Sequence, residues 1–211
     1  DNSTCLMYAS GHGFSSGASA SLLHDESRGW GMRETLQCEQ KYPEASLDHM
    51  AQLFQQRWPL KRVYIAMNLH QNAPIMRDMT KVMTAFAKRL RSKSIFLSVV
   101  ESGSDDGTAG YVQDLANEMH QIGVRTAIKT SGNGGNSLVS PVFHPGDPGS
   151  GFRIDFLAKM RNAALDPLYR LHEKGHDFDV VLFANDIVFC EGDMWRLAAL
   201  EADMACGFDF N

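Results

Sequence analysis

The sequence lacks the patterns that mark several large functional classes. No run of apolar residues approaches the roughly 20 that a membrane-spanning helix needs, and no cluster of Lys and Arg offers a surface for nucleic-acid phosphates. The 25 acidic residues outnumber the 20 basic ones. We therefore expect no nucleic-acid partner, and we expect any membrane attachment to come from a segment absent from this chain.

Common catalytic and metal-binding motifs are also missing. The chain has no CxxC or HExxH pair for zinc, no GxSxG elbow for a serine hydrolase and no GxGxxG after a strand for a dinucleotide. Cysteine is scarce, and its count leaves the compartment open because free buried cysteine is common. A sequon at Asn2 permits a secretory location. The four cysteines allow three pairings, of which we favour Cys5 with Cys38 and Cys190 with Cys206.

What the sequence does contain is a long alternation of strand-like and helix-like segments. Residues 1–45 show no sustained period, which predicts an irregular arm, and a short helix begins at Ser46. From residue 61 onwards, short apolar runs alternate with amphipathic segments. The predicted strands are residues 63–67, 94–100, 124–129, 178–184 and 204–208, and the predicted helices are residues 74–90, 108–122, 153–174 and 194–200.

This alternation predicts the fold class. It is typical of an α/β domain in which helices flank a mostly parallel sheet. We therefore predict one α/β domain over residues 61–211, preceded by an N-terminal arm and short helix over residues 1–60.

Polar residues gather where the predicted strands end. In an open α/β sheet, ligands bind beyond the carboxyl ends of the strands. Asn68 follows the first strand, and residues 101–108 follow the second. Asn185 and Asp186 follow the fourth strand, and Asp209 follows the last. These positions are the candidate binding site.

Asp186 carries the strongest chemical signal. It follows the most apolar strand of the chain, and apolar sequence resumes directly after it. A carboxylate at the edge of a sheet can bind a hard divalent cation that also bridges phosphate oxygens. The alternative is that Asp186 is a turn or helix-capping residue, but Asp193 is better placed to cap the helix that follows.

The loop over residues 101–108 is dense in acidic and hydroxyl side chains and leads into a helix. Such groups suit the hydroxyls of a ribose and the edge of a base better than they suit phosphate. The alternative, equally supported, is that Ser104 or Asp106 caps the helix. The candidate nucleotide-binding residues of the loop are Glu101, Ser102, Ser104 and Asp106.

Basic residues lie early in the helix over residues 153–174. Arg153, Lys159 and Arg161 would neutralise a diphosphate if they faced the site, and Asn162 lies beside Arg161. The alternative is a solvated basic face.

Five segments, in order, resemble the CAP59-like fungal mannosyltransferases, the family of the cryptococcal α-1,3-mannosyltransferase. The resemblance covers about residues 61–211. The segments are YIAMNLH at 64–70, VESGSDDGT at 100–108, MRNAAL at 160–165, LFANDIVF at 182–189 and ACGFDF at 205–210.

The resemblance implies a GT-A-like fold and a glycosyltransferase that moves mannose from GDP-mannose to a glycan hydroxyl, with retention of configuration and an α-1,3 linkage. It implies a divalent cation, typically Mn²⁺. It also implies a Golgi location, with the full-length form a type II membrane protein. Related domains continue beyond the last segment, so we expect further acceptor-binding sequence outside this chain.

Carried onto these residues, the resemblance places Asn185 and Asp186 at the metal-binding DxD element. Val188 stands where a second carboxylate would be, so the metal would depend on Asp186 with ligands from elsewhere. Arg161 and Asn162 would lie beside the diphosphate. The expected catalytic residues are Asp186, Arg161 and, on the acceptor side, Asp209.

Two other functions would use the same features. A nucleotidyltransferase would use the same carboxylate at the sheet edge and would release pyrophosphate instead of GDP. A non-catalytic module would use the acidic loops to bind a sugar or a partner protein.

Overall fold

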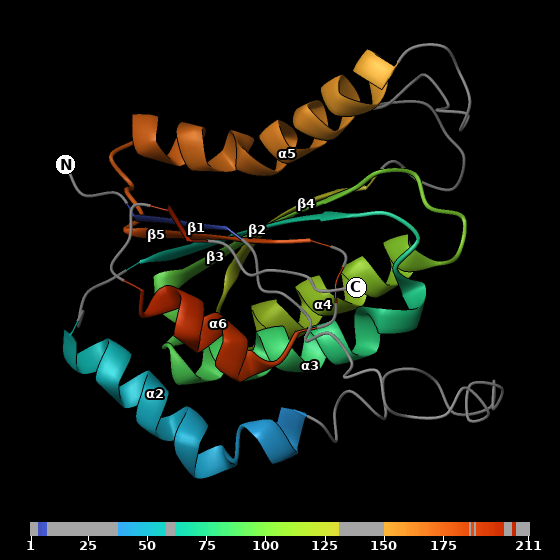
Figure 1. The fold of residues 1–211 in the computed structure, drawn as a ribbon. Helices are drawn as coiled ribbons and strands as arrows, with labels where there is room; N and C mark the ends of the chain where they lie inside the picture. The colour runs from blue at the N-terminus through green and yellow to red at the C-terminus, as the bar shows by residue number, and fades with distance from the viewer. Residues whose placement is uncertain are drawn as a thin grey trace, which may run out of the picture.

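The computed structural model describes residues 4–7, 38–57, 62–130, 150–185, 187, 189–200 and 204–205. Within these ranges a six-stranded sheet lies between two layers of helices (Figure 1). Every pair of neighbouring strands is parallel, and the strand order is β4-β3-β2-β5-β1-β6. The strands are β1 Thr4–Met7, β2 Val63–Leu69, β3 Ile95–Glu101, β4 Arg125–Thr130, β5 Val180–Ala184 and β6 Met204–Ala205. The helices are α2 Glu44–Arg57, α3 Ala73–Arg89, the 3₁₀ turn η2 Ser92–Ser94, α4 Thr108–Gln121, α5 Ser150–Glu173 and α6 Glu191–Ala198.

The predicted α/β class with a parallel sheet is confirmed. From residue 63 onwards, strands and helices alternate as the apolar spacing predicts, with boundaries shifted by a few residues. One strand was not predicted. Thr4–Met7 forms β1, which lies in the sheet between β5 and β6. Four residues are too short a segment for hydrophobic periodicity to distinguish a strand from an irregular arm.

The central strands are buried on both faces. In β2, Val63, Ile65 and Met67 join the core that α3 and α4 cover, whereas Tyr64 and Ala66 join the core beneath α5. This alternation follows from the period of two in a strand. Near-continuous apolar strands are therefore expected here, because a parallel sheet is covered on both sides.

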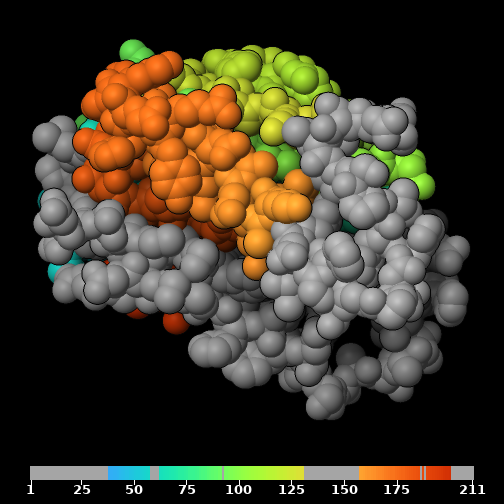
Figure 2. Space-filling model, turned by 90° about the horizontal axis from the view of Figure 1, so that it is seen from above, coloured from blue at the N-terminus to red at the C-terminus, as the bar shows by residue number. Residues whose placement is uncertain are grey.

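Among the described helices, α5 alone covers one face of the sheet (Figure 1), and its atoms are the orange area in the view onto that face (Figure 2). The Tyr64 hydroxyl donates to the Ala164 carbonyl of α5 at 2.8 Å, and the Tyr64 ring stacks on Phe96. Burial raises the pKa of Tyr64 to about 12, against the opposing effect of a hydrogen bond with Ser98. Helix α5 contains Pro167 and continues through it.

The other face carries α2, α3, α4 and α6 (Figure 1). Arg89 at the end of α3 links three of these helices. Its guanidinium contacts Glu44 and Asp48 of α2 and donates to Glu191 of α6 at 2.5 Å. Trp195 Nε1 donates to the second oxygen of Glu191 at 2.9 Å. The buried Glu191 carboxylate is therefore satisfied from two helices at once.

The cysteine pairing differs from the one we favoured. Cys38 is bonded to Cys190, with 5.3 Å between their Cα atoms, a usual separation for a disulfide. The predicted pairings of Cys38 with Cys5 and of Cys190 with Cys206 are therefore wrong. Sequence spacing could not reveal that the residues before α2 lie against the start of α6. In the described part of the chain, no helix is both long and apolar enough to span a membrane.

Candidate functional site

The order of the strands places the candidate site between β2 and β5. From the carboxyl end of β2 the chain leads through α3 to β3 on one side, whereas from β5 it leads through α6 to β6 on the other side. Neighbouring strands whose connections diverge in this way form a topological switch point, where open α/β sheets bind ligands. The sequence predicted the ligand-binding edge, and the structure identifies which strand ends meet there.

Asn68 and Asn185 lie at this switch point. Met67 is paired with Ala184 across β2 and β5, and Asn68 and Asn185 are the residues that directly follow these two. Met67 and Ala184 both belong to the core on the α3 side. Asn68, which is still within β2, therefore projects to the opposite face, which α5 covers. Asn185 is only 9% exposed.

Asn68 carries an unusual feature. Within the described residues, its Oδ1 is the one buried side-chain oxygen or nitrogen that has no hydrogen-bond partner. Buried polar atoms in native proteins are nearly always paired, and leaving one unpaired costs about 1–3 kcal/mol. An amide oxygen can accept a hydrogen bond from a hydroxyl or ligate a hard cation. The site therefore presents an acceptor that the protein itself does not use.

The loops that follow β2 and β3 are bonded to each other. The Ser104 hydroxyl accepts a hydrogen bond from the Gln71 N–H at 3.0 Å, and the Thr108 hydroxyl accepts one from the Asn72 N–H at 2.8 Å. The Asn72 side chain accepts from the His70 N–H at 2.6 Å. These bonds hold Gln71 in the left-handed region at a φ of 57°, a conformation that persists only when its surroundings enforce it.

The candidate residues of the 101–108 loop contribute to this bonding. Glu101 is fully buried and accepts a hydrogen bond from the Ser104 N–H at 2.5 Å. Ser102 donates to the Leu69 carbonyl through its N–H at 3.0 Å and its hydroxyl at 3.3 Å. These side chains thus make a rigid edge beside Asn68. Direct contact of Glu101, Ser102 and Ser104 with a nucleotide stays a prediction.

Asp106 joins the starts of two helices. Its carboxylate accepts from the Thr108 N–H at 3.0 Å and hydroxyl at 2.6 Å, and from the Ala73 N–H at 2.9 Å. Partial burial acts to raise the Asp106 pKa, but these hydrogen bonds outweigh it and the pKa lies below its usual value. The N-cap of α4 is Gly107 at a φ of 93°, so the prediction of Ser104 or Asp106 at that position is wrong. Contact of Asp106 with a nucleotide stays a prediction.

Three candidate residues of α5 are exposed to solvent. Met160 and Ala164 are the buried residues that face the sheet. Lys159, Arg161 and Asn162 are exposed, because neighbouring helix positions turn by about 100° from Met160. Their placement agrees with the alternative interpretation, in which these residues form a basic face exposed to solvent. The predicted role of Arg161 and Asn162 beside a diphosphate is untested.

Two predicted residues lie outside the described part of the chain. They are Asp186, the expected metal ligand, and Asp209, the expected acceptor-side residue. The side chain of Arg153 is also outside it. Among the described residues, no group of three or more His, Cys, Asp or Glu side chains could hold a metal ion.

The start of α6 corrects another prediction. We expected Asp193 to cap a helix over residues 194–200, but α6 begins at Glu191 and its N-cap is Cys190. Asp193 is the third helical residue, and its carboxylate accepts from the Cys190 N–H at 3.1 Å. The two residues form a capping box, a motif in which N-cap and third residue satisfy each other's backbone.

The two loops are joined by residues to which the sequence alone assigned no individual role. Asn72, Gln71 and Thr108 make the hydrogen bonds that join the two loops. The available signal was the run of Asn and Gln directly after the first strand, where the chain must turn.

Comparison with known proteins identifies the family. A family model described as Cryptococcal mannosyltransferase 1 matches residues 62–211. The chain belongs to this mannosyltransferase family. The match to the mannosyltransferase family begins one residue before β2 and includes both Asn68 and Asn185. Searches of curated proteins and of solved structures found no match. The predicted resemblance is thereby confirmed, and family membership implies a glycosyltransferase of the mannosyltransferase type.

Proposed function

We propose that this chain transfers mannose from GDP-mannose to a glycan hydroxyl at the edge where β2 and β5 end. The observation that carries the proposal is the Asn68–Asn185 pair at the topological switch point, with an unused acceptor on Asn68. The match to the mannosyltransferase family covers this edge. Retention of configuration and an α-1,3 linkage are part of the proposal.

The chain's own residues would bind and orient the donor. Asn68 Oδ1 would accept a hydrogen bond from a donor hydroxyl, and the Asn185 amide would contact the same ligand from the neighbouring strand. The rigid loops around Ser104 and Thr108 keep this edge in one conformation. Such preorganisation lowers the entropy lost on binding and holds the reacting atoms in place.

The residues present are compatible with a divalent cation. Amide and carboxylate oxygens suit hard ions such as Mn²⁺. Asp186, with an amide oxygen of Asn185 or Asn68, would hold the ion, and the bound ion would neutralise charge on the departing GDP. Arg161 and Asn162 are exposed on α5, so their proposed role requires the diphosphate to extend to the surface of that helix.

The acceptor side completes the proposal. The acceptor hydroxyl attacks the anomeric carbon from the face that GDP leaves. The bond from that carbon to GDP breaks, the bond to the acceptor oxygen forms, and the acceptor proton leaves with GDP. Asp209 is proposed to orient the acceptor glycan.

The disulfide supports the proposed location. Disulfides persist in oxidising compartments such as the secretory pathway and are rare where glutathione keeps thiols reduced. The Cys38–Cys190 bond joins residues 152 positions apart. This bond supports a proposed location in the secretory pathway. The Golgi lumen is proposed from the family resemblance.

Product analysis tests the reaction directly. The protein is incubated with GDP-mannose, Mn²⁺ and a panel of mannose-containing glycans, and released GDP and mannosylated product are quantified. We expect both to form in equal amounts, and we expect Asp186→Ala to reduce transfer by at least about a hundredfold. Pyrophosphate release from sugar phosphate and nucleotide would instead identify a nucleotidyltransferase. Full activity of Asp186→Ala would refute the role of Asp186.

A further inference from the structure

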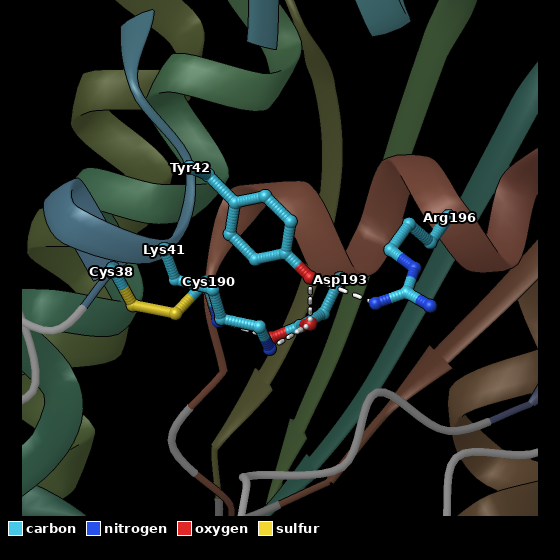
Figure 3. The surroundings of a disulfide bond; sticks show 6 residues. All are labelled: Cys38, Lys41, Tyr42, Cys190, Asp193 and Arg196. Atoms are coloured by element: carbon cyan, nitrogen blue, oxygen red, sulfur yellow. Dashed lines mark hydrogen bonds and ion pairs between the residues drawn. A yellow bond between two sulfur atoms is a disulfide. The ribbon is translucent and has the colours of Figure 1, made fainter. Parts of the chain in front are cut away.

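A disulfide lies immediately after the segment that extends from β5. Asn185 follows the last residue of β5, and Cys190 is the N-cap of α6. Only four residues separate Asn185 from Cys190. Cys190 is bonded to Cys38, which belongs to the segment before α2 (Figure 3). Asn185 therefore directly follows a strand of the sheet, and Cys190 is held by a covalent bond.

Polar bonds reinforce the disulfide. Asp193 Oδ1 accepts from Lys41 Nζ at 2.8 Å and from the Tyr42 hydroxyl at 2.7 Å. Asp193 Oδ2 accepts from the Cys190 N–H. The Asp193 carboxylate therefore bonds to both sides of the disulfide, and Figure 3 shows its position between Tyr42 and Cys190.

Close packing adds a third type of contact. The Tyr42 ring lies against Gly192, and a Cβ at position 192 would lie 2.3 Å from the nearest ring carbon. Real Cβ atoms do not approach carbon so closely, so any larger residue would displace the ring or the helix. The start of α6 is therefore held against residues 38–42 by a disulfide, hydrogen bonds and a glycine contact. We call this group of Cys38, Lys41, Tyr42, Cys190, Gly192 and Asp193 the clamp.

We propose that the clamp is a positioning device for Asn185 at the donor-binding edge. Only the GDP-mannose-binding measurement below rests on the proposed function. Because four residues separate Asn185 from Cys190, a shift at the start of α6 would be transmitted to Asn185. The clamp lies outside the binding edge itself, so its residues act through the segment and not by contact with substrate.

We expect the rest of α6 to keep its place when the disulfide is reduced. Trp195 and Met194 are buried in the core, and Glu191 is bonded to Arg89 of α3, and neither interaction involves the disulfide. Loss of the disulfide should therefore loosen residues 185–190 while the remainder of the fold persists. This separates a positioning role from a general contribution to stability.

Reduction and serine substitution test the clamp. A dithiol reductant supplies two electrons and two protons, so Cys38 and Cys190 become thiols and the reductant becomes a cyclic disulfide. Cys190→Ser removes the disulfide but retains a good N-cap residue, and Cys38→Ser leaves α6 unchanged. We expect reduction of the wild-type protein, and each of the two serine substitutions, to accelerate amide hydrogen exchange selectively at residues 185–190. We also expect each of these changes to weaken GDP-mannose binding about tenfold. Adding reductant to either variant should cause no further change.

Gly192→Ala tests the packing with the disulfide intact. Alanine is about 1 kcal/mol more favourable than glycine inside a helix, so any loosening must come from the contact with Tyr42. Gly110→Ala in α4 is the matched control, because a Cβ there meets nothing within 4 Å. We expect Gly192→Ala to reproduce the exchange pattern of the serine variants and Gly110→Ala to match the wild type.

The two readouts separate the clamp from the proposed function. Unchanged exchange at residues 185–190 after reduction would overturn the clamp, and so would an equal increase across the whole chain. If exchange changes as expected but the wild-type protein does not bind GDP-mannose, the clamp stands and the proposed donor is wrong.

Discussion

At the scale of single residues, two asparagines of one strand-end segment have opposite roles. Asn72 is buried and its side chain accepts a hydrogen bond from the His70 N–H, so it stabilises the loop. Asn68 has a buried oxygen without a partner. A polar group that the fold leaves unsatisfied is one that a ligand can satisfy. Functional sites often contain such features at the expense of stability.

This difference predicts opposite effects of two alanine substitutions. Asn72→Ala should lower the free energy of unfolding by about 1–3 kcal/mol, because it removes the acceptor of the His70 N–H. Asn68→Ala should leave the free energy within about 0.5 kcal/mol of the wild-type value or raise it, because the oxygen that it removes is unpaired. Urea denaturation of the three proteins measures both effects. A loss above about 1 kcal/mol in Asn68→Ala would show that Asn68 is structural.

At the scale of elements, the helices on the α3 side are joined by Arg89. Its three carboxylate partners differ in burial: the Glu44 side chain is 76% exposed, whereas that of Glu191 is 7% exposed. Exposed ion pairs contribute little because water screens them. A buried carboxylate that two helices satisfy is expected to contribute more when one partner is removed.

Glu191→Ala should therefore destabilise the protein by about 2–4 kcal/mol, since it leaves Trp195 Nε1 buried without an acceptor. Glu44→Ala is the matched control on the same guanidinium, and we expect a loss below about 1 kcal/mol. Thermal unfolding of the two variants provides the comparison. Equal losses of stability in Glu191→Ala and Glu44→Ala would mean that the burial of Glu191 does not determine how much it stabilises the protein.

At the scale of the whole molecule, the sequence predicted what depends on local pattern. The period of apolar residues predicted the α/β class and the strands and α-helices from residue 63 onwards, because burial on both sheet faces imposes that period. It did not predict the 3₁₀ helix η2. It also did not predict β1, the Cys38–Cys190 bond or the start of α6. The first two depend on segments far apart in the chain, as with Cys38 and Cys190. The start of α6 instead depends on the local capping box of Cys190 and Asp193.

The same distinction applies to the candidate site. Asn68 and Asn185 could be selected from the sequence because ligands bind beyond the carboxyl ends of strands in open α/β sheets. Applying this rule requires only the order of strands and helices along the chain. That these two meet at the switch point depends on the β2–β5 pairing, which the sequence does not show. The hydrogen bonds of Ser104 with Gln71 and of Asp106 with Ala73 likewise depend on the segment after β2. The family match then added the enzyme class, which neither pattern nor topology contains.

The central claim is that the edge between β2 and β5 binds GDP-mannose, and calorimetric titration tests it most directly. GDP-mannose is titrated into the disulfide-bonded protein with Mn²⁺ present, and the same titration is made with Asn68→Ala. We predict one donor molecule bound per chain, with a Kd that rises at least about tenfold in Asn68→Ala, since one hydrogen bond in a desolvated site contributes about 1.5 kcal/mol. Absence of binding to the wild-type protein, or an equal Kd in the variant, would contradict the account.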